Sequence, residues 1–233
     1  LIREDLSQYD LSSLQYCCTA GEALNAAVYD KFLALTGLHL MEGFGQTETT
    51  LTLGTFPWMT PKPGSMGKPN PQYDIDLVKP DGTPCEDGEK GEIVIRTSRR
   101  PIGLFKEYYL DDEKTHEAWH DGLYHTGDVA WRDEDGFYFI AGRKKRFLKL
   151  FGNRVSLDYL EALLKTYLKE CVCVGNDSKL IVYTTDRDYD AEAIVDFLVG
   201  RTKILRSVFS VRSIDAIPRS ETGKILYKEL PIE

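Results

Sequence analysis

Several common sequence signals are missing from this chain of 233 residues. No segment approaches the roughly 20 consecutive apolar residues that a membrane-spanning helix needs, and the opening residues LIREDLSQYD do not follow a signal-peptide pattern. Five cysteines argue against a disulfide-stapled secreted module. Repeats and low-complexity segments are also missing. We therefore expect a globular, cytoplasmic protein without a membrane span.

The sequence also lacks the spacing of a zinc site and of a Walker phosphate loop. Cys17–Cys18 and Cys171–Cys173 are close pairs, but the four histidines lie elsewhere, so we expect buried free thiols. The segment PRSETGK at 218–224 does not match GxxxxGK[ST]. Lys224 in this segment is therefore not a Walker lysine, and the simplest interpretation is a solvated surface lysine.

Positive charge is scarce in the first part of the chain and abundant in the second. Residues 1–142 contain 12 Lys and Arg against 24 Asp and Glu, whereas residues 143–233 contain 17 against 13. The change begins abruptly at Arg143-Lys144-Lys145-Arg146, which predicts a domain boundary there, with domains 1–142 and 143–233. Nucleic acid is not an expected partner, because the acidic part would repel phosphates and no recognition motif accompanies the basic run.

What the chain does contain is enough apolar material for packed cores, at 42% hydrophobic and 11% aromatic residues. The first domain is predicted to open with a strand, a helix and a strand, and to continue as antiparallel strands. The second domain is predicted to be a small α+β fold with two amphipathic helices, the first capped by Ser156. The predicted elements are 14–20, 22–36, 38–43, Tyr73–Val78, Glu92–Arg96 and Phe137–Ala141, then 146–151, 157–168, 171–185, a helix after Asp190 and Phe209–Ile214.

Two polar segments of the first domain are suited to ligand chemistry. The loop 43–50, GFGQTETT, gathers hydroxyls, an amide and a carboxylate on a flexible backbone, which could cradle an oxyanion and hold a divalent cation through Glu48. The segment 124–128, YHTGD, places Asp128 where it could accept hydrogen bonds from paired sugar hydroxyls. Each segment alone is equally well explained as an ordinary polar turn.

Three segments of the second domain have the same ambiguity. Arg143 follows a glycine at the domain boundary, and Gly152 lies between cations in KLFGNR at 149–154. Lys224 lies in a loop near the C-terminus. Glycine permits close approach of the backbone to a ligand, although a turn explains it as well.

Taken together, and in their order along the chain, these segments resemble the successive core motifs of the adenylate-forming superfamily. That superfamily includes acyl-CoA synthetases, carrier-loading adenylation domains and beetle luciferases. The stretch from GFGQTET to PIGLFKEYY looks most like medium-chain acyl-CoA synthetases. The motifs are GEA at 21–23, GFGQTET at 43–49, PGSMGKP at 63–69, GEIVIR at 91–96, YHTGD at 124–128, GR at 142–143, KLFGNR at 149–154 and PRSETGK at 218–224.

The resemblance implies a fold and a reaction. The fold is the last part of a large α/β domain, comprising a βαβ piece and an antiparallel β-subdomain, followed by a small, mobile α+β lid domain. The reaction converts a carboxylic acid and ATP, with Mg²⁺, to an acyl-adenylate, and then transfers the acyl group to coenzyme A. The positions that the resemblance assigns to the nucleotide are Gly21, Glu22 and Ala23 for the adenine pocket, Phe44 for stacking on the base, and Asp128 with Arg143 for the ribose.

The same resemblance assigns the reacting groups. Thr47 would contact the α-phosphate, Glu48 would hold Mg²⁺, and Lys224 would bridge the carboxylate and the α-phosphate. Gly152 would flank the pantetheine channel of coenzyme A, with Arg154 near a phosphate. A cation that meets the growing negative charge on the α-phosphoryl oxygens stabilises the transition state selectively.

Gly45 is the position that the resemblance links to substrate size. Acetate-specific relatives carry a bulky tryptophan there, so a glycine predicts an open acyl pocket suited to propionate, butyrate or longer fatty acids.

The chain departs from the family pattern in two places. The Ser/Thr/Gly-rich phosphate loop is absent, so we expect the chain to be a fragment, a split-gene product or one half of an assembly with a missing N-terminal portion, inactive alone. Lys145 and Arg146 replace the acidic residues usual after the GR motif, which predicts an altered hinge. The alternative functions are a carrier-protein-loading enzyme and a non-catalytic nucleotide-binding remnant.

Overall fold

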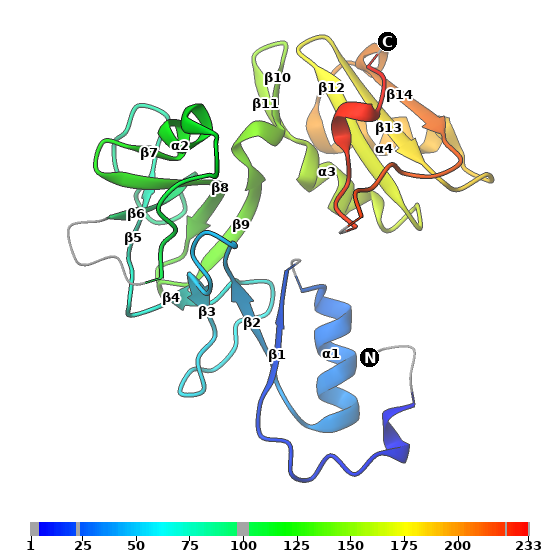
Figure 1. The fold of residues 1–233 in the computed structure, drawn as a ribbon. Coiled ribbons are helices and arrows are strands. Elements are labelled where there is room, and N and C mark those ends of the chain that lie inside the picture. Colours follow the sequence, from blue (N-terminus) through cyan, green and yellow to red (C-terminus); the bar gives the residue numbers. More distant parts are fainter. Residues whose placement is uncertain (1–4, 22–23, 97–102, 222, 233) are drawn as a thin grey trace. The chain divides into compact units, whose positions relative to one another are not determined.

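The computed structural model describes residues 5–21, 24–96, 103–221 and 223–232. The chain forms two compact units, Leu1–Ile140 (unit 1) and Ala141–Glu233 (unit 2), which are described separately (Figure 1). The division lies just before the predicted boundary, so Gly142 and Arg143 belong to unit 2.

Unit 1 opens with the predicted βαβ arrangement. The α1 helix begins after Asn25, whose side chain accepts a hydrogen bond from the Ala27 N–H at 2.8 Å, and ends at Gly37 in the left-handed conformation. Its start is later than predicted because Asn25, and not a residue near 22, provides the cap. The elements are η1 (Leu6–Gln8), β1 (Cys17–Ala20), α1 (Ala26–Thr36) and β2 (Leu40–Phe44), and β1 pairs with β2 in parallel.

β3 and β4 extend the sheet of β1 and β2, and a second, antiparallel sheet contributes much of the main core of unit 1. The predicted strands at 73–78, 92–96 and 137–141 are confirmed as β5, β6 and β9, whereas the sequence reading missed α2, β7 and the ten-residue β8. Strands lie in the order β5-β6-β8-β7, and β9 also pairs with β8. The elements are β3 (Leu53–Gly54), β4 (Lys68–Pro69), β5 (Asp74–Val78), β6 (Gly91–Arg96), α2 (Asp112–Ala118), β7 (Trp119–His120), β8 (Leu123–Arg132) and β9 (Tyr138–Arg143).

Unit 2 is the predicted small α+β fold, built on a three-stranded sheet in the order β12-β13-β14. One core cluster joins α3 and α4 to the sheet. A second cluster is formed by residues of β12 and β13 together with Ile217 and Leu230, which lie outside the strands. The elements are η2 (Lys144–Arg146), β10 (Phe147–Leu150), β11 (Asn153–Ser156), α3 (Leu157–Leu164), β12 (Cys171–Asn176), β13 (Lys179–Thr184), α4 (Ala191–Thr202), η3 (Arg206–Val208), β14 (Phe209–Ser213) and η4 (Tyr227–Glu229).

Two local predictions for unit 2 have different outcomes. Ser156 caps α3 as predicted, accepting a hydrogen bond from the Tyr159 N–H at 3.2 Å. The predicted strand over 146–151 is wrong at both ends, since Arg146 ends a 3₁₀ turn and Phe151 has a positive φ of 48° in the hairpin turn between β10 and β11.

Arg146 is the main polar contact inside unit 2. Its guanidinium donates to Asp158 Oδ1 at 2.7 Å and to the Cys173 carbonyl at 2.9 Å, and it also bonds Glu161. Its side chain is only 11% exposed, and its charged group lies 3.8 Å from the centre of the Tyr227 ring. Arg146 therefore ties the basic run after β9 to the interior of unit 2.

The five cysteines are free, as expected, but not all are buried. Cys173 is fully buried, whereas Cys18 is exposed because β1 is an edge strand whose alternate residues face solvent. In the described part of the chain, no helix has the length and apolar character required to cross a membrane.

Candidate functional site

The loop that follows β2 is closed by its own hydrogen bonds. The Thr50 N–H donates to the Gln46 carbonyl at 2.8 Å, and the Gln46 N–H donates to Thr49 Oγ1 at 3.1 Å. Thr49 is fully buried, whereas Thr47 is exposed and Glu48 half-buried. The turn thus fixes one threonine in the interior and leaves the predicted phosphate and metal residues accessible.

Gly45 is required in this loop for a reason that the sequence did not reveal. A Cβ at this position would lie 1.5 Å from the Thr50 carbonyl oxygen and 3.2 Å from the Leu51 Cα. No side chain fits such a close approach of two backbone segments. The glycine therefore has a backbone role in addition to the pocket role predicted from the resemblance, which stays a prediction.

Glu48 is held at one carboxylate oxygen. The Tyr108 hydroxyl donates to Glu48 Oε1 at 2.8 Å, and the Phe105 N–H donates to the Glu48 carbonyl at 2.8 Å. Within the described residues, the second carboxylate oxygen accepts no hydrogen bond, and no three His, Cys, Asp or Glu side chains gather as a metal-binding group. A single accessible carboxylate fits Mg²⁺, which binds through one or two carboxylates together with substrate phosphates and water.

Asp128 lies in β8 and is only 3% exposed. The Gln46 side-chain amide donates to Asp128 Oδ2 at 2.5 Å and to the Thr126 carbonyl at 2.8 Å. The Tyr124 hydroxyl donates to Oε1 of the same amide at 2.7 Å. Gln46 therefore joins the Glu48 loop to Asp128, two segments that the sequence separates by about 80 residues.

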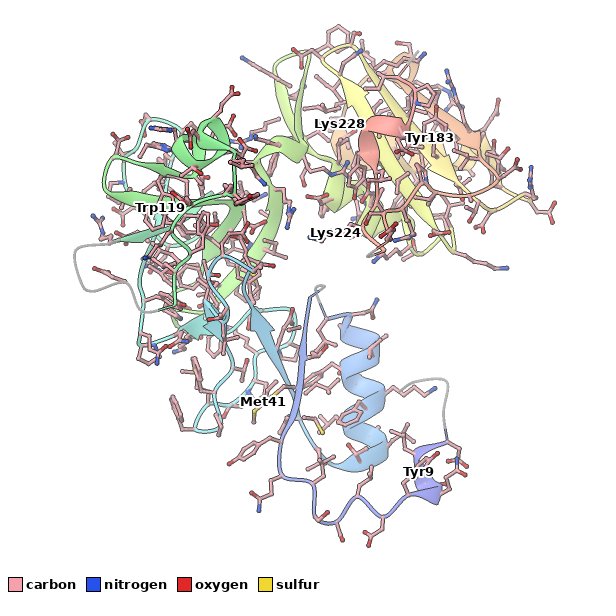
Figure 2. The ribbon with its side chains drawn as sticks, viewed as in Figure 1. Tyr9, Met41, Trp119, Tyr183, Lys224 and Lys228 are labelled. Carbon is pink, nitrogen blue, oxygen red and sulfur yellow. The ribbon has the colours of Figure 1, made fainter. Side chains whose placement is uncertain are left out.

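An aromatic cluster supports both carboxylates from within unit 1. The Phe105 ring lies 4.8 Å from Tyr108 and 5.4 Å from Tyr124, and Trp119 lies 5.3 Å from Tyr124, between ring centres. Burial and the hydrogen bond to Glu48 raise the pKa of Tyr108 to about 12. Burial raises the pKa of Tyr124 further above its ordinary value. Both hydroxyls consequently stay protonated donors at neutral pH. Trp119 is labelled in Figure 2.

The predicted adenine segment is described only in part. Gly21 has a positive φ of 98°, and Glu22 and Ala23 lie outside the described residues. Directly after them, the Leu24 N–H donates to Glu42 Oε1 at 3.1 Å. Glu42 is a buried residue of β2, and burial raises its pKa. Its carboxylate fixes the end of the segment, a role that sequence reasoning missed.

Phe44 ends β2, the strand that leads into the Glu48 loop. Its ring is partly buried against the main core of unit 1. Part of the side chain stays accessible, as a ring that stacks on a base requires.

The first two unit 2 segments are held by turns and local contacts. The Arg143 N–H donates to Asp158 Oδ2 at 2.9 Å. Gly152 has a φ of 84° in the β10–β11 hairpin, and a Cβ there would meet nothing within 4 Å. The Arg154 guanidinium lies 4.4 Å from the centre of the Phe147 ring.

Lys224 occupies a loop before η4 and is exposed (Figure 2). The Ser220 N–H donates to the Lys224 carbonyl at 2.8 Å, and the Lys224 N–H donates to Ser220 Oγ at 3.2 Å. Arg219 anchors the same loop by donating to Glu170 at 2.7 Å. The loop holds the lysine backbone firmly while its ammonium group faces solvent.

Within unit 1 the structure thus brings together three predicted residues, Thr47, Glu48 and Asp128. The residues that hold them, Gln46, Tyr108 and Tyr124, were not predicted as site residues. Gln46 lies inside a recognised motif, and it is the amide of a loop otherwise rich in hydroxyls. Tyr124 lies in the motif YHTGD and Tyr108 in the stretch PIGLFKEYY, but the hydrogen bonds themselves join residues 60 to 82 positions apart, so sequence alone did not reveal them.

Comparison with known proteins gives a consistent result. Residues 2–109 match the family described as AMP-binding enzyme. The acyl-coenzyme A synthetase ACSM5, mitochondrial, of Rattus norvegicus is 33% identical over 246 residues, covering 99% of this chain and 43% of that protein. The 4-hydroxybutyrate–CoA ligase 1 of Metallosphaera sedula is 33% identical over 240 residues, covering 97% and 42%. The chain therefore spans less than half the length of these curated relatives.

Solved structures share the fold. The anthranilate CoA ligase AuaEII, in complex with anthranoyl-AMP, matches with a TM-score of 0.70 and 28% identity over 95% of this chain and 45% of that chain. The O-succinylbenzoate coenzyme A synthetase MenE from Bacillus subtilis, in complex with AMP, matches with a TM-score of 0.76 and 21% identity over 94% and 48%. At that lower identity the likeness concerns the fold alone.

Proposed function

Because the chain belongs to the family of AMP-binding, adenylate-forming enzymes, we propose that it is part of an AMP-forming acid–thiol ligase, an acyl-CoA synthetase. Its substrates are a short- to medium-chain fatty acid, ATP with Mg²⁺, and coenzyme A. The chain spans less than half of its relatives, so a further N-terminal portion, in the same chain or in a partner, completes this activity. The mammalian relatives are named as mitochondrial, and the cytoplasmic location stays a prediction.

The observation that carries this proposal is the pairing of Asp128 with the Glu48 loop through Gln46. Asp128 has a buried carboxylate whose one oxygen is fixed by an amide at 2.5 Å. A fixed carboxylate is suited to accept hydrogen bonds from the two ribose hydroxyls of an adenylate. In this proposal Arg143 assists at the ribose, Phe44 stacks on adenine, and the Gly21 segment lines the base.

The reacting groups of the adenylation step are proposed as follows. The Thr47 hydroxyl donates to an α-phosphate oxygen, and the Glu48 carboxylate binds the metal. Bound Mg²⁺ supplies positive charge to the phosphate oxygens. Lys224 adds an ammonium group where negative charge grows as the carboxylate attacks the α-phosphorus and pyrophosphate leaves, which stabilises that state over the ground state.

In the thioester-forming step, unit 2 contributes two exposed features. Gly152 offers a hairpin turn without a side chain, along which a pantetheine arm can pass. Arg154 offers a guanidinium to a phosphate of coenzyme A. The relatives that are named as coenzyme A synthetases and ligases favour coenzyme A as the thiol acceptor.

Calorimetric titration with a non-hydrolysable acyl-adenylate mimic tests this function. We expect the wild-type chain to bind one mimic, and Asp128→Ala to bind about 100-fold more weakly, since two hydrogen bonds to a charged acceptor are lost. Asp87→Ala, which removes an exposed carboxylate paired with Arg132, is the matched control and should bind like wild type. Equal affinity of Asp128→Ala and wild type would contradict the proposed site.

A further inference from the structure

The aromatic cluster of unit 1 contains two tyrosine hydroxyls that the proposed reaction does not use directly. The Tyr108 hydroxyl donates a hydrogen bond to Glu48, and the Tyr124 hydroxyl donates one to Gln46. We propose that Tyr108 and Tyr124 are positioning residues: Tyr108 orients Glu48 toward the metal, and Tyr124 orients Asp128 toward the ribose by fixing the Gln46 amide. This inference rests on the proposed function. It adds which side chain orients the metal-binding carboxylate and which orients the ribose-binding carboxylate.

The Tyr108 contact restricts the Glu48 carboxylate. The hydroxyl occupies Oε1 at 2.8 Å, while the Phe105 N–H holds the backbone of the same residue at 2.8 Å. Glu48 is thus held once at its backbone and once at its carboxylate, and among the described residues the second carboxylate oxygen accepts no hydrogen bond. Partners that hydrogen-bond a ligating carboxylate orient it, and their removal typically weakens metal binding about 10- to 100-fold.

The Tyr124 contact completes the hydrogen bonds of the Gln46 amide. The hydroxyl donates to Oε1 at 2.7 Å, while the amide nitrogen donates to Asp128 Oδ2 and to the Thr126 carbonyl. An amide turned the other way would place its oxygen against a carboxylate and a carbonyl, which repel it. Tyr124 is 1% exposed, so its ring is fixed by packing.

Each hydroxyl donates to a different acceptor, Glu48 Oε1 for Tyr108 and Gln46 Oε1 for Tyr124, and the two hydroxyls also interact with each other. The largest effect of each substitution is therefore expected at the acceptor that loses its hydrogen bond. Tyr108→Phe and Tyr124→Phe delete a single oxygen each and keep the rings that pack against Phe105. Loss of the first hydroxyl should affect metal binding, and loss of the second should affect recognition of the ribose. Tyr183→Phe in unit 2 is the matched control, because it deletes a buried hydroxyl that donates to the Pro231 carbonyl at 2.9 Å. Tyr183 is labelled in Figure 2.

The experiment measures two binding quantities on the full chain. The first is the Mg²⁺ concentration that half-saturates enhancement of ATP binding, and the second is the ratio of affinities for AMP and 2′,3′-dideoxy-AMP. Tyr108→Phe should raise the half-saturating Mg²⁺ concentration about tenfold and leave the AMP ratio near that of wild type. Tyr124→Phe should reduce the ratio of affinities for AMP and 2′,3′-dideoxy-AMP about tenfold, which corresponds to one weakened charge-assisted contact. Its half-saturating Mg²⁺ concentration should stay near that of wild type.

A spectroscopic measurement tests the Gln46 step without any ligand. In the ¹⁵N-labelled chain, the side-chain amide that disappears in Gln46→Ala should exchange its protons slowly in wild type and in Tyr108→Phe. In Tyr124→Phe the same amide should exchange at least tenfold faster. Unfolding curves of all variants ensure that only folded protein is compared.

The outcomes separate the inference from the function on which it rests. If wild type shows neither Mg²⁺ enhancement nor preference for AMP over the dideoxy nucleotide, the proposed function is contradicted, and the ligand-directed inference with it. If wild type shows both properties and the two tyrosine variants behave like Tyr183→Phe, the inference alone is overturned. Unchanged Gln46 amide exchange in Tyr124→Phe overturns it as well.

Discussion

The candidate site residues of unit 1 and those of unit 2 are held in place in different ways. Glu48 and Asp128 depend on side-chain hydrogen bonds from residues 60 to 82 positions away in the sequence. Gly152 and Arg154 instead lie in the β10–β11 hairpin, and Lys224 lies in a loop closed by Ser220, which Arg219 also anchors to Glu170. The positions proposed for the ribose and the metal in unit 1 thus depend on tertiary contacts, whereas the proposed groups of unit 2 lie on a hairpin and a loop held mainly by nearby residues.

This difference predicts where substitutions have large effects. A change in the interior of unit 1 should disturb ligand recognition, even when it lies far from the ligand in the sequence. A change at a unit 2 turn should leave folding almost intact. The exception in unit 2 is Arg146, whose guanidinium bonds Asp158, Glu161 and the Cys173 carbonyl.

Arg146→Met should have the largest effect. It leaves Glu161 buried with no cation, and breaking a buried ion pair typically costs about 3–5 kcal/mol of unfolding free energy. Burial already raises the pKa of Glu161, and loss of Arg146 raises it further. The folded variant then binds that proton more tightly than the unfolded chain, so the destabilisation should diminish as the pH falls through the folded pKa of Glu161.

Urea denaturation over a pH series measures this effect. Arg219→Met is the control, because the Arg219–Glu170 pair is more than 40% exposed and should contribute about 0–1 kcal/mol. Equal destabilisation by the two substitutions would contradict the difference between the buried and the exposed pair.

A pair of glycine substitutions compares the two units directly. Gly45→Ala should destabilise unit 1 by about 2–3 kcal/mol and weaken binding of the acyl-adenylate mimic, because the new Cβ collides with the Thr50 carbonyl. Gly152→Ala should cost only about 1 kcal/mol, since its Cβ meets open space and only the positive φ is unfavourable. Thermal unfolding measures the destabilisation caused by each substitution. A larger loss of stability in Gly152→Ala than in Gly45→Ala would contradict the expected difference.

Lys224→Ala should have the smallest effect on folding. The side chain is exposed, and substitutions at such positions usually change the unfolding free energy by less than about 0.5 kcal/mol. The urea midpoint of this variant should match wild type. A clearly lower midpoint would mean that the ammonium group supports the fold of unit 2.

The sequence predicted the local elements of the fold well where hydrophobic spacing and caps act over a few residues. The helix ending at Gly37 and the cap at Ser156 are examples. It missed β8, because that strand buries Asp128 among apolar residues and so does not alternate as a typical strand does.

The order of the motifs led to Glu48 and Asp128, but their partners could not be predicted in the same way. Tyr108 and Tyr124 lie in stretches that carry the family resemblance, but in the sequence they look like ordinary aromatic residues of a loop and a strand. Their hydroxyls acquire specific acceptors only when β8, the segment before α2 and the loop after β2 pack together. Cys18 illustrates the same limit, since its exposure follows from the edge position of β1.

Equilibrium binding of AMP to wild type, Asp128→Asn and Lys224→Ala tests most directly whether Asp128 of unit 1, and not Lys224 of unit 2, determines recognition of AMP. The account predicts that Asp128→Asn loses at least tenfold in affinity, because the buried carboxylate is replaced by a neutral amide, while Lys224→Ala binds AMP within about twofold of wild type. An equal loss in the two variants, or normal binding by Asp128→Asn, would contradict it.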